Sequence, residues 1–185
     1  MNDTADVLRA CQGDTAAASD LLKRAYKPVF AYLRRLCGNE QDAADLTQRT
    51  FAKVWQSLPT FQGRSTFSTW VHGIAHHVYV DWRRSRRATE AQSDAWWETC
   101  AASQATPFDN AVESDVARQL YRCVEQLDEN KRQVIHLHYF QHLTLKETAE
   151  ALSIAVSTVK YRLREALDFL RTRTTDLTLK GQDHE

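Results

Sequence analysis

Glycine, proline and long apolar stretches are all scarce in this chain. Its 185 residues include 5 glycines and 3 prolines, with few runs of β-branched residues. This composition, together with long segments of helical period, predicts an all-α fold. No apolar run approaches the roughly 18 residues that a membrane span requires, and the first residues lack the apolar core of a signal peptide. We therefore expect a cytoplasmic protein with no segment inserted into a membrane.

Cysteines and catalytic motifs are equally sparse. The four cysteines are widely separated and form no CxxC pair: Cys11, Cys37, Cys100 and Cys123. This spacing indicates neither a disulfide framework nor a zinc knuckle. Nucleophile elbows, phosphate-binding Gly loops and HExxH motifs are all missing.

Histidines gather in two groups that no carboxylate or thiolate joins at a metal-binding spacing: His72 with His76, and His136 with His138 and His142. We expect no metal, no cofactor and no enzymatic activity. The alternative from the enzyme class is a histidine-based metalloenzyme, which would contain stoichiometric bound metal.

Charge is balanced overall but unevenly distributed. The chain has 24 Lys and Arg and 24 Asp and Glu, a formal net charge of zero. Residues 88–117 contain six of the acids and no Lys or Arg, which leaves 24 basic and 18 acidic residues elsewhere. A neutral total therefore hides a basic body that an acidic segment interrupts.

The stretch from Ser65 to Arg87 joins an apolar stripe to dense positive charge. Apolar side chains recur at the spacing of one helix face: Phe67, Trp70, Val71, Ile74, Ala75, Val78 and Trp82. The remaining face carries Thr69, His72, His76, Arg83 and Arg87. Ser65 is the candidate N-cap, and the arginines would complement the C-terminal helix dipole. Such a helix can pack on a bundle and present guanidinium groups to phosphates; a solvated surface helix is the alternative.

Three more helices are expected before this stretch, over 4–11, over 15–37, and from after Asn39 to before Pro59. Gly13 and Asp14 would break the chain between the first two and provide a new N-cap, and Gly38 would end the second. The third should bury Leu46, Phe51, Val54, Trp55 and Leu58. Four helices joined by tight loops predict one bundle over residues 1–87.

The helical pattern fails between residues 88 and 111, where Ser, Thr, Ala, Gln and acids dominate. We interpret this segment as a flexible linker, which averages roughly 25 to 30 Å end to end. Trp96 and Trp97 within it would pack on a partner or on the protein's own domain.

Helical periodicity resumes over residues 112–173, and residues 174–185 are expected to form a tail. Thr144 and Glu147 form a capping box that opens a short helix to Leu152. A three-residue turn then leads into a last helix from Val156 to about residue 173, the helix-turn-helix pattern. Inward positions of that helix are Val156, Val159, Leu163, Ala166, Leu167 and Leu170. Ahead of the capping box, a helix that begins at Val112 carries an inward stripe of Val116, Leu120, Cys123, Val124 and Leu127. A second helix is expected from Glu129 to Phe140.

Four motifs follow one another at residues 42–55, 61–70, 74–87 and 127–170. In this order they resemble an extracytoplasmic-function (ECF) sigma factor of the sigma-70 family, group 4. Residues 42–55 (DAADLTQRTFAKVW) resemble the helix that binds the β′ clamp helices of core RNA polymerase. Residues 61–70 (FQGRSTFSTW) resemble the loop that captures a flipped base of the minus-10 element. Residues 74–87 (IAHHVYVDWRRSRR) resemble the basic helix after that loop. Residues 127–170, which include LTLKETAEALSIAVSTVKYRLREAL, resemble the domain that reads the minus-35 element.

The resemblance implies three sets of site residues. Contacts to core polymerase would come from Asp42, Asp45, Gln48, Phe51, Val54 and Trp55. Contacts to the minus-10 element would come from Phe61, Arg64, Ser65, Phe67, Trp70, His76, His77, Arg83, Arg84 and Arg87. Contacts to the minus-35 element would come from Ser157, Thr158, Lys160, Tyr161, Arg162 and Arg164. For Phe67 and Trp70, a core position is the alternative to a base contact.

The resemblance also implies an anti-sigma factor that masks these surfaces, and a linker that threads the polymerase cleft. The sequence departs from the family pattern at several positions. His76 and His77 stand in place of Arg-Asn, Arg49 in place of an acid, and Ser153 in place of Gly. Glu165 and Leu167 occupy Arg positions, and Ala155 an N-cap position.

The predicted function is promoter recognition and transcription initiation together with core RNA polymerase. The alternative is an autonomous dimeric helix-turn-helix regulator, which would bind duplex DNA without polymerase.

Overall fold

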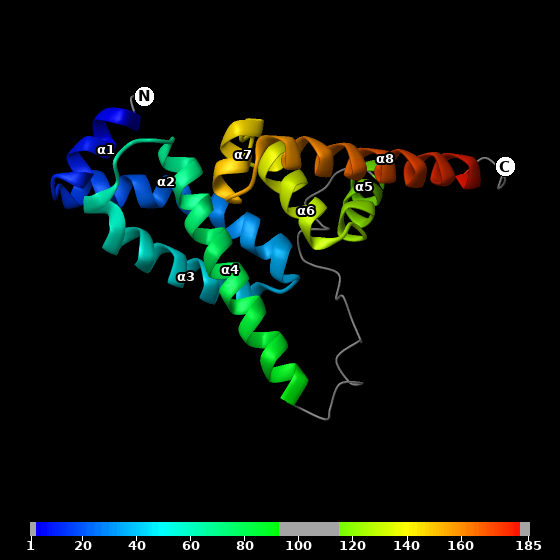
Figure 1. The fold of residues 1–185 in the computed structure, drawn as a ribbon, viewed down its shortest axis with the longest axis horizontal. Coiled ribbons are helices and arrows are strands. Elements are labelled where there is room, and N and C mark those ends of the chain that lie inside the picture. Colours follow the sequence, from blue (N-terminus) through cyan, green and yellow to red (C-terminus); the bar gives the residue numbers. More distant parts are fainter. Residues whose placement is uncertain (1–2, 93–114, 182–185) are drawn as a thin grey trace. The chain divides into compact units, whose positions relative to one another are not determined.

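The computed structural model describes residues 3–92 and 115–181, and over these ranges it contains helices and no β-strand. The chain divides into two compact units. Helices α1 to α4 belong to the first, and the second is built mainly from α5, α6, α7 and α8 (Figure 1). The predicted all-α class with two helical domains is confirmed.

The first unit contains α1 (Asp3–Cys11), α2 (Thr15–Cys37), α3 (Glu40–Ser57), the 3-10 turn η1 (Leu58–Thr60) and α4 (Phe67–Gln92). Helix α2 packs against α1, α3 and α4, and α3 also packs against α4. Apolar side chains from these helices form a fully buried core: Val29, Tyr32, Leu33, Leu46, Val54, Val71 and Ala75. Each large side chain of this kind contributes about 1.5 to 3 kcal/mol when it is removed from water.

The helix ends follow local signals in the sequence. The Asp14 carboxylate accepts hydrogen bonds from the Ala16 and Ala17 N–H groups, each at 3.0 Å, and so caps α2. Gly38 ends α2 with a φ of 78°, a left-handed conformation that glycine adopts without steric cost. The Asn39 side chain caps α3 by accepting from the Asp42 N–H at 2.8 Å.

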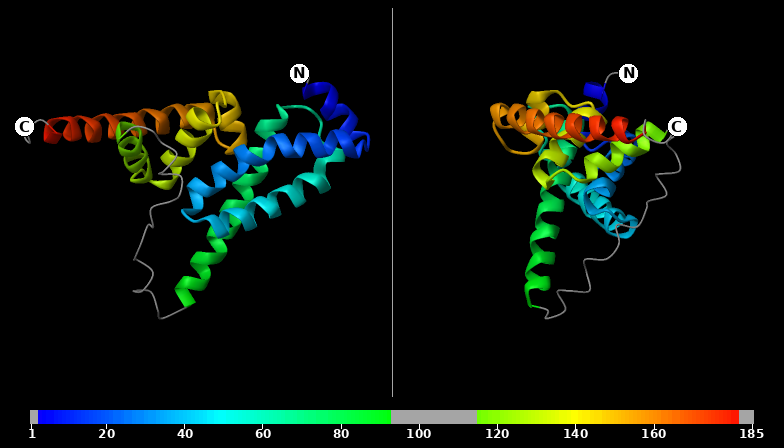
Figure 2. Two further views of the ribbon diagram at one scale, coloured as in Figure 1. Left: turned by 180° about the vertical axis from the view of Figure 1, so that it is seen from behind. Right: turned by 90° about the vertical axis from the view of Figure 1, so that its right-hand side faces the viewer.

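Helix α4 differs from its prediction at both ends. Its cap is Thr66, not Ser65, because the Thr66 hydroxyl accepts from the Thr69 N–H at 3.1 Å. The helix runs on to Gln92, five residues past the expected end at residue 87 (Figure 2). The arginines therefore lie in the helix interior and not in its last turn.

Burial corrects several positions that the helical pattern placed wrongly. Thr69 and His72 are buried, since the Thr69 hydroxyl meets that of Thr66 and the His72 Nδ1 lies 2.8 Å from the Ser68 carbonyl oxygen. Local bonding of this kind lets a polar side chain enter a core. In contrast, Trp55 is 49% exposed. Leu120 and Val156 in the second unit are also exposed.

The second unit contains α5 (Asp115–Glu125), α6 (Glu129–Ile135), the π-helical turn η3 (His136–Phe140), α7 (Leu145–Ala151) and α8 (Val156–Gly181). Asp128 caps α6, and a capping box opens α7, in which Glu147 N–H donates to the Thr144 hydroxyl and Thr144 N–H donates to the Glu147 carboxylate. Helix α8 packs on α5 and α6 through Val159, Leu163, Ala166 and Leu170.

Two elements of the second unit differ from their predictions. The helix expected over residues 129–140 divides into α6 and η3, and α8 continues to Gly181, eight residues beyond its expected end (Figure 1). Helix α4 takes the first five residues of the predicted linker. The rest of that linker, with Trp96, Trp97 and Cys100, lies outside the described residues.

The described residues contain neither a membrane-spanning helix nor a metal-binding cluster. None of their helices is both long and apolar enough to cross a bilayer. Likewise, no three of their His, Cys, Asp or Glu side chains group as a metal would require.

Candidate nucleic-acid and polymerase interfaces

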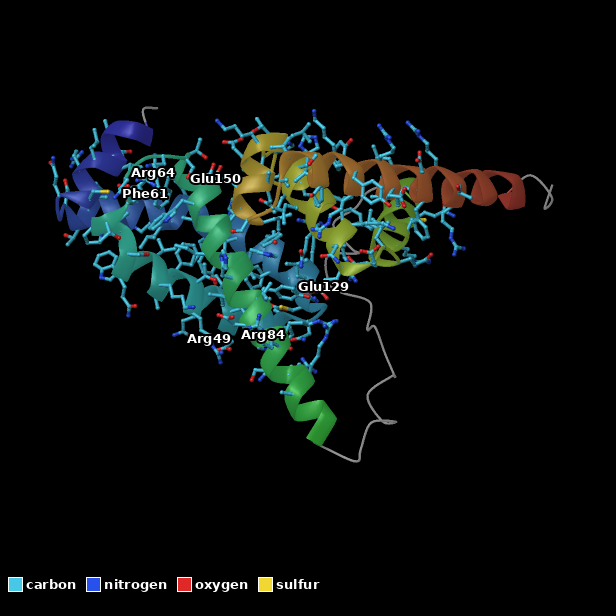
Figure 3. All side chains as sticks on the ribbon, viewed as in Figure 1. Arg49, Phe61, Arg64, Arg84, Glu129 and Glu150 are labelled. Carbon is cyan, nitrogen blue, oxygen red and sulfur yellow. The ribbon has the colours of Figure 1, made fainter. Side chains whose placement is uncertain are left out.

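The loop between η1 and α4 and the first turn of α4 together carry a cluster of three aromatic rings. The Phe61 ring centroid lies 4.7 Å from that of Trp70 and 6.2 Å from that of Phe67. Phe67 is buried, which makes it a core residue, whereas Phe61 and Trp70 are only half-buried. Gly63, with a φ of 66°, turns the loop, and Arg64 beyond it is exposed near Phe61 (Figure 3). The loop thus presents aromatic surface beside a guanidinium group.

A pocket of about 490 Å³ lies beside this loop, between α3, η1 and α4. Its lining mixes polar and apolar side chains: Lys53, Gln56, Ser57, Thr60, Ile74 and His77. The Ser57 and Thr60 hydroxyls donate to the Lys53 and Ser57 carbonyls at 2.6 and 2.7 Å, so their lone pairs remain able to accept. Of these six residues, the sequence predicted only His77 as a site residue, because the pocket arises from the packing of α3 on α4.

Two adjacent histidines of α4 differ in their surroundings, and of the two only His77 lines the pocket. The His77 Nδ1 lies 2.7 Å from the Gly73 carbonyl oxygen, so Nδ1 carries the proton and Nε2 can accept when the ring is neutral. The His76 Nδ1 lies 3.5 Å from the hydroxyl of Tyr32, a fully buried residue of α2. His77 is therefore placed toward the solvent side of the pocket and His76 toward the core.

The arginines of α4 have different surroundings. Arg84 is exposed toward the far part of the helix (Figure 3), Arg87 is also exposed, and Arg83 is half-buried. Arg86 donates to Asp42 at 3.0 Å and its guanidinium lies 5.3 Å from the Trp82 ring centroid. Arg86, which the sequence analysis did not assign to DNA, thus joins α4 to the start of α3.

The exposed face of α3 contains most of the residues expected to contact polymerase. Asp45 and Gln48 are exposed, and Asp45 pairs with Arg49 at 2.8 Å (Figure 3 labels Arg49). Trp55 lies at the other end of the face. Val54, in contrast, is fully buried, so it supports the helix from inside and offers no surface to a partner.

An aromatic surface extends from α3 to α2. The Phe51 ring stacks on that of Tyr26, with centroids 5.8 Å apart and planes 24° from parallel. Tyr26 also stacks on Phe30 at 6.2 Å, and Tyr26 is 49% exposed. The sequence did not predict this exposed ring, because its position depends on how α2 and α3 pack together.

The N-terminal half of α8 presents a polar surface. Ser157, Lys160, Tyr161 and Arg164 are exposed, while Thr158 and Arg162 are half-buried. Tyr161 is 62% exposed, the largest value among the exposed large apolar and aromatic side chains of the described residues. Glu165, at a position where the family has Arg, lies 3.9 Å from Lys131 of α6 and so contributes an ion pair within the unit.

Two sequence models of known families match this chain. Sigma-70 region 2 matches residues 21–89, and Sigma-70, region 4 matches residues 117–170. These ranges contain the pocket and the polar face of α8, respectively.

Curated relatives match over most of their length. The ECF RNA polymerase sigma factor SigX of Bacillus subtilis is 30% identical over 164 residues, 86% of this chain and 84% of that protein. The ECF RNA polymerase sigma factor SigW of the same species is 26% identical over 174 residues, 90% of this chain and 93% of that protein.

Two of the solved structures that share the fold are complexes. One is the sigma factor RpoE in complex with the anti-sigma factor NepR from Bartonella quintana, with a TM-score of 0.72, 20% identity, and coverage of 85% of this chain and 96% of that one. The other is CnrH in complex with the cytosolic domain of CnrY, with a TM-score of 0.68, 23% identity, and coverage of 94% and 97%. With both region models matched in order and a relative at 30% identity, this chain belongs to the ECF sigma factors of the sigma-70 family.

Proposed function

We propose that the chain binds core RNA polymerase, recognises a promoter at two elements and directs transcription initiation in the cytoplasm without catalysing a reaction itself. The pocket between α3 and α4, next to the exposed loop with Phe61 and Arg64, is the observation that carries this proposal. Strand separation requires that bases leave the stack, which costs a few kcal/mol per step. A preformed pocket offsets that cost by holding an extruded base.

The lining suits a nucleobase. Ile74 offers an apolar wall for the base plane, and the hydroxyls of Ser57 and Thr60 offer hydrogen-bonding groups for its edge. Lys53 of α3, whose ammonium lies 4.0 Å from the Asp81 carboxylate, also lines the pocket and would meet a phosphate or a carbonyl of the base. Phe61 and Trp70 would stack with neighbouring bases, and Arg83, Arg84 and Arg87 would neutralise phosphates of the separated strand.

The other two surfaces complete this role. The exposed face of α3, with Asp45, Gln48, Phe51 and Trp55, would contact the β′ clamp helices of polymerase. The polar face of α8, with Ser157, Lys160, Tyr161 and Arg164, would enter the major groove of the minus-35 element. Asp42 and Val54 would support the first surface without touching polymerase, since Asp42 pairs with Arg86 and Val54 is buried.

We also propose that an anti-sigma factor regulates the chain. Among the solved structures that share its fold, one holds a sigma factor bound to the anti-sigma factor NepR, and another holds CnrH bound to the cytosolic domain of CnrY. Membership of the sigma family disfavours the alternative of an autonomous dimeric regulator.

Run-off transcription tests the proposal. Purified core polymerase is combined with the wild-type chain or with Asp45→Ala plus Gln48→Ala on fragmented genomic DNA. A matched control, Asp20→Ala plus Gln12→Ala, removes the same groups from exposed positions away from the α3 face. We expect discrete start sites with wild type and control and their loss with the first variant. If wild type yields none in the absence of inhibitor, the proposal is wrong.

A further inference from the structure

Cys11 ends α1 and lies against the segment that joins α3 to α4. Its Sγ is 3.2 Å from the Leu58 carbonyl oxygen and 3.9 Å from the Phe61 carbonyl oxygen. Because a carbonyl oxygen only accepts, the thiol is the donor. Leu58 is the first residue of η1, and Phe61 directly follows its last residue. The Cys11 side chain therefore contacts both ends of the turn.

The turn that Cys11 spans forms part of the proposed base pocket. Thr60, inside η1, lines the pocket, and Phe61 follows directly. The turn itself is short, and the Phe61 N–H closes it through one bond of 3.1 Å to the Leu58 carbonyl. A 3-10 turn of this length has poor hydrogen-bond geometry. Contact with α1 therefore contributes to where this wall of the pocket stands.

The protonation state of the Cys11 thiol is consistent with its role as a hydrogen-bond donor. Cys11 is half-buried, and burial raises the pKa of its thiol above the ordinary cysteine value. At neutral pH the side chain keeps its proton, and its single S–H hydrogen can donate to the nearer Leu58 carbonyl or be shared with the Phe61 carbonyl.

We infer that Cys11 is a positioning residue for promoter opening: from the end of α1 it holds η1 and Phe61 at the place where an extruded base is received. The inference rests on the proposed function, and it adds α1 to the elements that shape the minus-10 site. Cys11 itself touches no DNA in this scheme.

The test compares Cys11→Ala with Cys11→Ser in holoenzyme assembled from the full-length chain and core polymerase. The probe is a promoter found by run-off transcription, with the fluorescent base 2-aminopurine at the position that opens. We expect Cys11→Ala to slow opening about two- to five-fold, the loss of a weak hydrogen bond. Cys11→Ser keeps a donor and should open at close to the wild-type rate. Both variants should bind polymerase as wild type does.

The control is Leu8→Ala, which shortens an exposed side chain on the same helix and should leave the opening rate unchanged. If Cys11→Ala proves unfolded by circular dichroism, Cys11→Val fills the space without a donor and takes its place. Opening at the wild-type rate by the variant without a donor, or equal slowing by Cys11→Ser, overturns the inference. A wild-type holoenzyme that starts no transcript would instead contradict the proposed function.

Discussion

Ser153 occupies a backbone conformation that favours glycine. Its φ is 55°, in the left-handed region, within the turn between α7 and α8. For a residue with a Cβ, this conformation costs about 1 to 2 kcal/mol of stability. Glycine avoids that steric cost but loses about 0.5 to 1 kcal/mol more in chain entropy on folding. We therefore expect Ser153→Gly to raise the free energy of unfolding by about 0.5 to 1 kcal/mol, measured by urea denaturation. Ser153→Ala retains the Cβ and should bring no gain. Equal stability of the glycine and alanine variants would contradict this explanation.

Asp14 gives a stability effect that depends on pH. The hydrogen bond from the Ala17 N–H, and then that from Arg9, lower the pKa of its carboxyl in the folded chain. The ionised carboxylate therefore stabilises the fold above the ordinary pKa of aspartate, and this stabilisation is lost as the pH falls through the lower, folded value. We expect Asp14→Ala to melt below wild type at pH 7, with the gap narrowing below about pH 4. Asp14→Asn retains an oxygen that can cap and should fall between the two. A gap that keeps its size as the pH falls well below the ordinary pKa of aspartate would contradict the role of the charge.

At the residue scale, the sequence predicted caps better than burial. Asp14, Gly38 and Thr144 were identified from residue type alone, because each satisfies backbone groups next to it in the chain. Trp55 and His72 were placed wrongly, since helical period tells which residues share a face but not which neighbour covers that face. Trp55 is large and apolar yet exposed, which favours its proposed role in polymerase contact.

At the scale of elements, α4 joins two surfaces that the sequence treated separately. Arg86 reaches Asp42 at the start of α3, so the helix with the arginine row is tied to the helix of the proposed polymerase face. The pocket between α3 and α4 likewise forms where these two helices pack together. No sequence pattern could predict either feature, because both depend on which turns of two helices meet. The extension of α4 was missed for a different reason: Ala88, Glu90, Ala91 and Gln92 are good helix formers but carry no apolar period.

The pairing of Arg86 predicts unequal roles within the arginine row. Removing a guanidinium that neutralises a phosphate lowers the slope of log affinity against log salt by about 0.7 to 1. We expect this loss for Arg84→Ala, measured by fluorescence anisotropy of the holoenzyme with labelled promoter DNA. Arg86→Ala should change the slope by less, since its charge is already paired with Asp42. Arg171→Ala, an exposed arginine late in α8, is the control. Equal changes for Arg84→Ala and Arg86→Ala would contradict this division.

At the scale of the whole molecule, two compact units with separate proposed DNA surfaces lie on one chain. The sequence predicted this division, because the helical pattern fails between them, although the predicted domain ends at residues 87 and 112 differ from the helix ends at Gln92 and Asp115. Joining two weak contacts on one chain makes the second binding event intramolecular. The gain over separate contacts is about 10²- to 10⁴-fold when both sites can be reached together.

Cutting the chain between its units tests whether that gain matters for promoter use. A protease site is introduced between residues 93 and 114, and run-off transcription is compared before and after cleavage. If minus-35 contact by α8 helps to deliver the first unit to the minus-10 element, cleavage should reduce transcript yield at least about 10-fold at submicromolar protein, because each unit must then bind independently. Circular dichroism before and after cleavage controls for unfolding, and the uncut chain with the inserted site controls for the insertion. Full transcript yield from the cleaved sample would show that the first unit alone, with polymerase, selects the promoter, and that α8 contributes nothing through the covalent connection.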